Sequence, residues 1–150
     1  QEWEELSRSL GLEDCVEFLG QQNTDAVAGH MRWCHLFCLP SVRESGGAVL
    51  LEAMAAARPV AAVAYGGPGE IVDEDVGRAV LPRNPQTVRA GFATIMRQVV
   101  GRPHDWRQRG LEGRRRAETQ YSWDSKITSA IQHFRSIIDA TPACRSDRAA

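Results

Sequence analysis

The chain has 150 residues, of which 43% are hydrophobic and 25% charged, a composition that fits one folded domain and excludes a chain disordered throughout. No apolar run approaches the length needed to cross a bilayer, and the acidic, amphipathic first residues are unlike a secretory signal. We therefore expect a cytoplasmic protein whose contact with membranes is at most peripheral.

We expect the cysteines to be reduced thiols. Disulfide frameworks are typical of small secreted domains with small cores, whereas this chain is of ordinary size and rich in apolar residues. They are Cys15, Cys34, Cys38 and Cys144. A zinc site is the alternative for the middle pair, which has His30 and His35 nearby. Structural zinc normally shows a second pair of ligands, and the sequence offers none, so we predict a core segment without metal or cofactor.

The net charge of −1 hides an uneven distribution. Residues 1–82 carry 5 basic and 13 acidic side chains, whereas residues 83–139 carry 11 and 5. The basic part includes Arg102, Arg107, Arg109, Arg114, Arg115 and Arg116. Such a cluster can meet phosphates, nucleic acid or an anionic membrane. Because no aromatic residues are interleaved, we favour a solvated helix face and predict no nucleic-acid partner.

Apolar residues at helical spacing alternate with short apolar runs typical of strands through residues 1–82. In chain order they predict a helix at 3–10, a strand at 15–19, a helix at 24–34, a strand at 36–39, a helix at 48–57, a strand at 60–64, a short helix at 70–72 and a strand at 78–81. This alternation indicates an α/β fold, a Rossmann-like parallel sheet with helices on both faces.

The second half of the chain is predicted to be helical. Helices are expected at 85–100, 105–120 and 123–139, followed by a flexible tail at 140–150. Residues 1–139 form the one predicted domain, because no linker interrupts them. This domain opens on a helix and offers about four strands where doubly wound sheets have about five or six, so we expect it to be truncated at its N-terminus.

Residues 40–54 hold the most informative stretch, PSVRESGGAVLLEAM, between a predicted strand and a predicted helix. This places it at the carboxyl edge of a parallel sheet, where open α/β folds bind ligands. Gly46 and Gly47 allow a ligand close to the backbone, and the N–H groups that open the next helix suit a phosphate. The alternative is a plain tight turn, which glycine pairs mark more often than they mark phosphate sites.

Two carboxylates border this stretch, Glu44 before the glycines and Glu52 within the apolar helix. We expect Glu52 to be buried and to need a hydrogen-bonding partner. Helical side chains lean toward the N-terminus of their helix, so both carboxylates can face one cleft and accept hydrogen bonds from the hydroxyls of a nucleotide sugar. The alternatives are an ion pair between Glu52 and Arg58 and an exposed loop charge at Glu44.

The segment ESGGAVLLEAMAAARPV resembles the E-x7-E signature of family 4 (group 1) glycosyltransferases, which have the GT-B fold. Further segments resemble this family in the same order: VEFLG at 16–20, LFCLPS at 36–41, GGPGEIV at 66–72, the Val76-Gly77 turn and YSW at 121–123. The resemblance covers nearly all of residues 1–139. It implies the C-terminal, nucleotide-sugar-binding domain of a retaining glycosyltransferase that requires no metal.

The resemblance also implies which residues contact a donor nucleotide sugar of the UDP or GDP type. These are Glu44 at the sugar, as the catalytic position; the backbone amides of Gly46, Gly47, Ala48 and Val49 at the sugar and diphosphate; Glu52 at the ribose; Gly20 and Gln21 at the base; and Gly66 and Gly67 on the acceptor side. Two positions depart from the family's usual residues. Phe-Gly is often found where this chain has Gly46-Gly47, and glycine is often found where it has Ala57.

Two parts of the family's enzymes are not found in these residues, the basic pair that contacts the diphosphate and the N-terminal acceptor domain. We therefore expect the chain to be inactive alone, because transfer depends on positioning and charge neutralisation. Two alternatives stay open, a catalytically silent nucleotide-sugar-binding or interaction module and a sugar-nucleotide epimerase of related fold. The histidines that the epimerase would need are not evident around Glu44.

Overall fold

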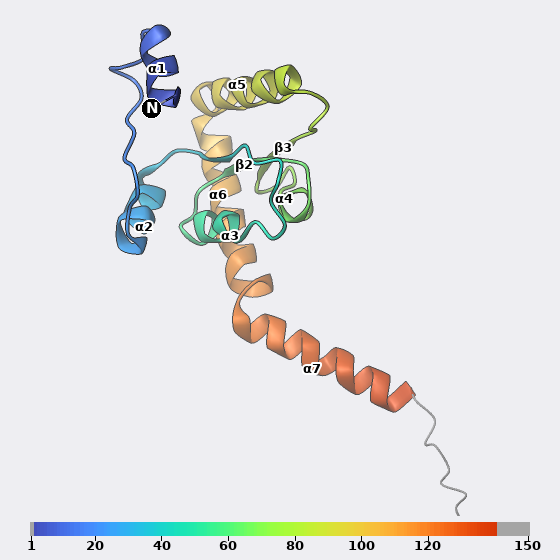
Figure 1. The fold of residues 1–150 in the computed structure, drawn as a ribbon. Coiled ribbons are helices and arrows are strands. Elements are labelled where there is room, and N and C mark those ends of the chain that lie inside the picture. The colour runs from blue at the N-terminus through green and yellow to red at the C-terminus, as the bar shows by residue number, and fades with distance from the viewer. Residues whose placement is uncertain (1, 141–150) are drawn as a thin grey trace, which may run out of the picture.

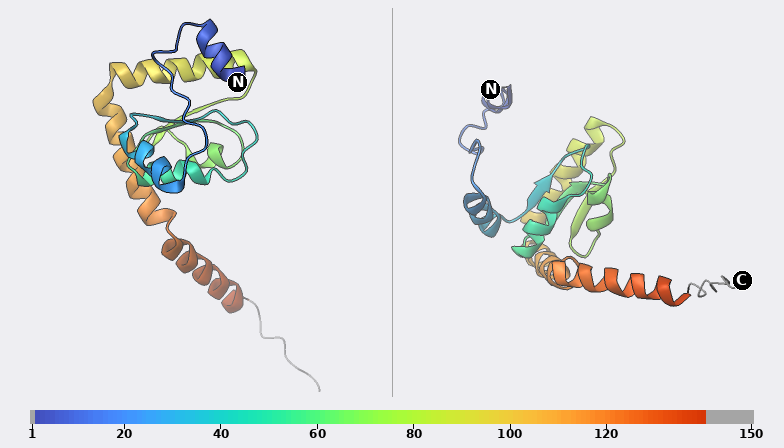
Figure 2. Two further views of the ribbon diagram at one scale, coloured as in Figure 1. Left: turned by 60° about the vertical axis from the view of Figure 1, so that its left-hand side comes forward. Right: turned by 60° about the horizontal axis from the view of Figure 1, so that its bottom comes forward.

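The computed structural model describes residues 2–140, which form a three-stranded parallel sheet flanked by helices (Figures 1 and 2). The strands are β1 (Phe37–Leu39), β2 (Val60–Val63) and β3 (Gly77–Val80), in the spatial order β1-β2-β3. The helices are α1 (Glu2–Ser9), α2 (Thr24–Trp33), α3 (Ala48–Ala55), α4 (Gly67–Ile71), α5 (Pro85–Gly101), α6 (Pro103–Gln120) and α7 (Trp123–Ala140). The predicted alternation of strands and helices is confirmed.

The central strand β2 is buried on both of its faces, and its side chains alternate between two hydrophobic clusters. Val60 and Ala62 pack on the side that α2, α3 and α4 cover. Ala61 and Val63 pack on the opposite side, which α5 and the start of α6 cover. Because side chains along a strand point alternately to either face, the near-continuous apolar sequence of β2 matches a sheet covered on both faces.

The strand predicted at 15–19 is wrong, since residues 16–20 form no regular secondary structure and belong to no strand of the sheet. Val16, Phe18 and Leu19 are 40%, 47% and 41% exposed. The apolar pattern of this segment is typical of a strand, but a strand forms only where a neighbouring strand accepts its backbone hydrogen bonds. The sheet within residues 2–140 therefore has three strands where about four were predicted.

Asparagine side chains begin two of the helices. Asn23 Oδ1 accepts the N–H of Ala26 at 2.9 Å and begins α2, and Asn84 Oδ1 accepts the N–H of Thr87 at 2.8 Å and begins α5. The short helix predicted at 70–72 instead begins at Gly67, inside the expected turn, because Pro68 in the first turn has the backbone angle that a helix start needs.

Helix α3 ends at Ala55, and Ala57, just after the C-cap residue Ala56, is left-handed with φ of 58°. The N–H of Arg58 donates to Ala53 O at 3.0 Å and that of Ala57 to Met54 O at 2.8 Å, the pair of bonds that defines a Schellman motif. Glycine is favoured at this position because a Cβ is strained when φ is positive. The alanine at residue 57 therefore costs stability, although it looks like a small change in the sequence.

Replacing Ala57 with glycine should raise the free energy of unfolding by about 1 kcal/mol, because it removes this strain. Urea unfolding followed by circular dichroism measures the change. Ala55→Gly is the matched control, since Ala55 is helical and exposed, and this change should lower stability by about 0.5–1 kcal/mol. Equal effects of the two substitutions would contradict the account of the helix end.

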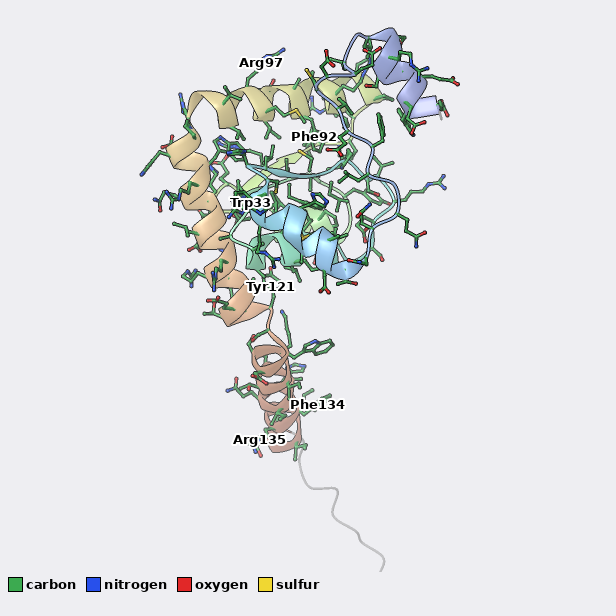
Figure 3. The ribbon with its side chains drawn as sticks, turned by 90° about the vertical axis from the view of Figure 1, so that its left-hand side faces the viewer. Trp33, Phe92, Arg97, Tyr121, Phe134 and Arg135 are labelled. Atoms are coloured by element: carbon green, nitrogen blue, oxygen red, sulfur yellow. The ribbon has the colours of Figure 1, made fainter. Side chains whose placement is uncertain are left out.

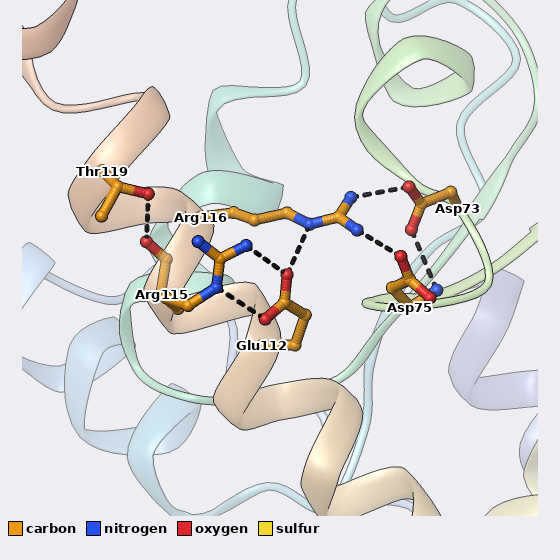
Figure 4. Close-up of polar contacts among 6 residues, drawn as sticks. All are labelled: Asp73, Asp75, Glu112, Arg115, Arg116 and Thr119. Carbon is orange, nitrogen blue, oxygen red and sulfur yellow. Dashed lines mark hydrogen bonds and ion pairs between the residues drawn. The ribbon is translucent and has the colours of Figure 1, made fainter.

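Arg116 joins α6 to the loop before β3 (Figure 4). Its guanidinium lies 2.6 Å from Asp73 Oδ2, 2.5 Å from Asp75 Oδ2 and 2.9 Å from Glu112 Oε1. The side chain of Arg116 is only 17% exposed. The predicted solvated helix face is therefore wrong for Arg116, which links two parts of the chain about forty residues apart.

This cluster makes stability depend on pH through Glu112. Hydrogen bonds from Arg115 and Arg116 lower the pKa of Glu112 from its ordinary 4.5 to about 2. For Asp73, burial raises the pKa, but hydrogen bonds from Arg116 and from the Asp75 N–H outweigh it and leave the pKa below its ordinary value. Carboxylates with lowered pKa stabilise the folded state above their unfolded pKa and lose that contribution as pH falls through the folded pKa.

The stability difference between the wild type and Glu112→Gln should therefore be largest above pH 4.5 and fade toward pH 2. Urea unfolding of both proteins across this range measures it. A difference that stays constant with pH would mean that the charge on Glu112 does not contribute.

Helix α7 projects away from the sheet (Figures 1 and 2) and has no buried residue. Phe134, labelled in Figure 3, points outward from this helix and is 63% exposed. Within residues 2–140, no helix combines the length and apolar character that crossing a bilayer requires. Ala140 still belongs to α7, and the rest of the predicted tail, residues 141–150, lies outside the described residues.

Candidate functional site

The segments that follow β1 and β2 meet at the carboxyl edge of the sheet, because these parallel strands are neighbours. The N–H of Gly67 donates to Ser45 O at 3.0 Å. A Cβ at Gly66 would lie 2.3 Å from Glu44 O, and one at Gly67 would lie 2.6 Å from the carbonyl oxygens of Ser45 and Gly46. The structure thus brings the predicted glycine turn at 66–67 directly against the predicted motif.

Glu44 is half-buried and folds back onto its own loop. Its Oε1 accepts the N–H of Gly46 at 3.2 Å and that of Gly47 at 3.0 Å. Gly47 is the N-cap of α3 and has a φ of 70°. The alternative of a plain exposed charge at Glu44 is therefore wrong, since the carboxylate holds the turn that begins α3.

The N-terminus of α3 accepts a negatively charged oxygen. Two of the four amides predicted to face a ligand, those of Gly46 and Gly47, hold the Glu44 carboxylate. The amides of Ala48 and Val49 donate to no acceptor among the described residues. Unpaired N–H groups at the start of a helix, together with the helix dipole, favour an anion such as a phosphate.

Glu52 is exposed, so the prediction that it is buried is wrong. Helix α3 buries one stripe, formed by Leu50, Ala53 and Met54, and Glu52 lies outside it. Residues 2–140 contain no ion pair between Glu52 and Arg58, whose guanidinium instead donates to Ala56 O at 3.0 Å and Cys34 O at 3.2 Å. The carboxylate of Glu52 is therefore open to a ligand.

Glu52 lines a groove of about 670 Å³ between α2 and α3. Thr24, Val27 and Ala28 of α2 line the same groove. Its other lining residues are Met31, Arg32, Ala55, Ala56, Ala57, Arg58 and Arg114. Glu44 does not line this groove, so the convergence of Glu44 and Glu52 on one cleft stays a prediction.

The two residues predicted near a base lie just before α2. Gly20 has a φ of 63° and lines a cavity of about 330 Å³ between α2 and β1, while Gln21 is exposed. Val27 and Met31 line both this cavity and the groove beside Glu52. The structure thus places Gly20 and Glu52 in neighbouring hollows that share one stretch of α2.

Comparison with known proteins assigns the chain to a family. Residues 1–112 match the family Glycosyl transferases group 1. The chain belongs to this family. It is 33% identical to the D-inositol 3-phosphate glycosyltransferase of Geodermatophilus obscurus over 132 residues, which are 87% of this chain and 28% of that protein. The chain therefore spans well under half the length of this curated relative.

Solved glycosyltransferase structures share the fold of the chain. Sucrose-phosphate synthase from Thermosynechococcus elongatus superposes with a TM-score of 0.77 and 29% identity over 93% of this chain and 34% of that one. Anabaena Alr3699/HepE in complex with UDP superposes with a TM-score of 0.73 and 25% identity over 93% of this chain and 36% of that one. The expected fold class, a Rossmann-like α/β domain of the GT-B glycosyltransferases, is confirmed.

In this glycosyltransferase domain the described cysteines are free thiols in different settings. Cys15 is exposed and Cys34 and Cys38 are half-buried, while Cys144 lies outside the described residues. Burial raises the pKa of Cys38 to about 11, with a smaller contribution from Cys34. Among the described residues, no group of three His, Cys, Asp or Glu side chains could hold a metal ion.

One contact of the candidate site could not be predicted from the sequence. The backbone of Gly66 and Gly67 touches the loop that carries Glu44. A glycine pair after a strand gives no sign of which backbone it approaches. The adjacency of β1 and β2 in the sheet decides this contact.

Proposed function

We propose that this chain is the C-terminal, donor-binding domain of a family 4 glycosyltransferase, which transfers a sugar from a nucleotide-diphosphate sugar to a hydroxyl acceptor. The observation that carries the proposal is the geometry of residues 44–52. A glycine turn begins α3, the amides of Ala48 and Val49 are unpaired, and Glu52 is exposed one turn further along the helix. Anabaena Alr3699/HepE, which shares the fold, is known in complex with UDP.

In this proposal each predicted residue has a physical task. The Ala48 and Val49 amides bind the diphosphate, and Glu52 accepts hydrogen bonds from the ribose hydroxyls. Glu44 contacts the hydroxyls of the donor sugar. Gly20 and Gln21 flank the base, and Gly66 and Gly67 fix the Glu44 loop on the acceptor side.

The contacts of Glu44 suggest that the donor replaces its carboxylate as the hydrogen-bond acceptor of the Gly46 and Gly47 amides. Its carboxylate occupies the amides of Gly46 and Gly47 in the free chain. A donor whose oxygens take over these amides releases Glu44, which then turns toward the sugar hydroxyls. In the absence of a donor, the Glu44 carboxylate thus stabilises the backbone conformation of the anion site.

Glu44→Gln should bind UDP more tightly than the wild type by about fivefold, because a charge near the diphosphate costs about 1 kcal/mol in water. The substitution should also remove the advantage of UDP-glucose over UDP, since the amide accepts hydroxyl hydrogen bonds less well than a carboxylate. Calorimetric titration of both ligands measures these changes. Weaker binding of UDP by a folded Glu44→Gln protein would count against this role.

Calorimetric titration of the wild-type chain with UDP, UMP and uridine tests the proposal as a whole. UDP should bind most tightly, because only it places a diphosphate on the amides that begin α3. Titration with GDP shows which base the chain prefers. If uridine bound as tightly as UDP, or if UDP did not bind at millimolar concentration, the proposed donor-binding role would be contradicted.

The complete enzyme is proposed to act with retention of configuration, together with an N-terminal acceptor domain. Support comes from the family assignment and from the relative of which this chain spans 28%. The chain alone should neither hydrolyse nor transfer the sugar of UDP-glucose, since positioning of the acceptor supplies much of the rate. The cytoplasmic location stays a prediction. Turnover by the isolated chain would contradict the proposal that a separate domain positions the acceptor.

A further inference from the structure

We propose that a cavity at the amino edge of the sheet, opposite the edge where residues 44–52 lie, binds a small organic acid. This acid carries an apolar body and one carboxylate. The cavity is about 560 Å³ and is lined by residues from the end of α5 and the start of α6. Figure 1 shows the place where α5 turns into α6. His35 and Pro59, which line the cavity, precede β1 and β2. It therefore opens at the amino edge, away from the motif at the carboxyl edge, and goes beyond the proposed function.

The walls of the cavity are apolar. Pro59, Val99, Val100, Pro103 and Leu111 line it, together with the ring of Trp106. Val100 is 82% exposed and Leu111 is 47% exposed, so these walls are open to a ligand from solvent. The volume falls within the range of about 300–1,000 Å³ that small-molecule sites occupy.

The polar groups around the cavity carry one sign of charge. Arg58, Arg107 and His35 line it, and none of its lining residues is a carboxylate. Arg58 uses two N–H groups for the carbonyls of Ala56 and Cys34. Its other N–H groups, and the guanidinium of Arg107, donate to no acceptor within residues 2–140. Charge complementarity therefore favours an anion.

Trp106 adds a hydrogen-bond donor to the wall of the cavity. This residue is only 3% exposed and lines the cavity. Its indole N–H donates to no acceptor within residues 2–140 and is not among the fully buried polar atoms, so it stays accessible to a ligand. A carboxylate held between Arg58 and Arg107 would supply that acceptor, while the apolar body of the acid packs on the indole ring.

Titration with naphthoate and with its neutral counterpart naphthylmethanol tests the proposal. Calorimetry should show the acid binding about tenfold or more tightly than the alcohol, because a carboxylate can form charge-assisted hydrogen bonds. The NMR signal of the Trp106 indole N–H should shift on binding. A saturating amount of UDP should not displace the acid, so this test succeeds or fails independently of the proposed donor site.

Two substitutions give the location of binding. Arg107→Glu should bring the affinities for acid and alcohol to within about twofold of each other, since Arg107 is exposed on α6 and its loss leaves the apolar walls intact. Phe134→Asn on α7 is the matched control and should change neither affinity. It removes an exposed apolar side chain from a helix outside the cavity.

Several outcomes would overturn the proposal. These are equal affinities for acid and alcohol, an unchanged preference in Arg107→Glu, a loss of binding in Phe134→Asn, and an indole signal of Trp106 that does not respond. Absence of binding by either compound up to its solubility limit would also overturn it.

Discussion

Glu52→Ala should weaken the binding of UDP by about 10- to 100-fold and leave the stability of the chain unchanged. A hydrogen bond to a charged group contributes about 1.5–3 kcal/mol, which corresponds to this range in affinity. Glu52 is exposed and makes no ion pair with Arg58, so the folded state does not depend on its carboxylate. Calorimetry with UDP and urea unfolding measure the two quantities separately.

Glu13→Ala is the matched control for this experiment. Glu13 is also exposed, but it precedes α2 and does not line the groove beside Glu52. Both substitutions remove one negative charge, so a general electrostatic effect would appear in both proteins. Equal changes in UDP affinity would show that Glu52 has no specific contact with the ribose.

Gly67→Ala should lower the free energy of unfolding by about 1–3 kcal/mol and weaken UDP binding by more than about tenfold. The new Cβ would lie 2.6 Å from the carbonyl oxygens of Ser45 and Gly46, which are backbone atoms that cannot rotate away. The Glu44 loop must then separate from the start of α4, and the turn that begins α3 moves with it. Urea unfolding and calorimetry measure both effects.

Gly29→Ala provides the control for this glycine. Gly29 lies within α2, and a Cβ there would meet nothing within 4 Å. Alanine at this helical position should raise stability by about 0.5–1 kcal/mol. A Gly67→Ala protein as stable as the wild type, with normal affinity for UDP, would mean that the contact between the two loops does not shape the site.

Most of the fold can be predicted from local patterns, because caps and apolar spacing are properties of neighbouring residues. The apolar residues of β2 give a strand in a sheet covered on both faces, as predicted, and the Asn23 side chain that begins α2 contacts an amide only three residues away. The segment at 16–20 differs, since its strand character depends on a partner strand that residues 2–140 do not contain. A pattern within one segment cannot show whether that partner is present.

The burial of the carboxylates in the candidate site could not be predicted from the sequence. Helix α3 is so rich in small apolar residues that its exposed face cannot be told from its buried one, and Glu52 was placed on the wrong face. The contact between Glu44 and the amides of Gly46 and Gly47 is local, yet its geometry depends on the backbone of the turn. The ion pair between Arg116 and Asp73 could not be predicted either, because only the folded chain brings these two distant residues together.

We propose that the turn at residues 44–47 and the first residues of α3 bind the diphosphate of a nucleotide sugar. Heteronuclear NMR of the chain titrated with UDP tests this most directly, because it reports each backbone amide separately. The largest shifts should occur at Ala48 and Val49, with Gly46, Gly47 and Glu52 also perturbed. UDP-dependent shifts confined to other parts of the chain, with these five amides unchanged at saturation, would contradict this proposal.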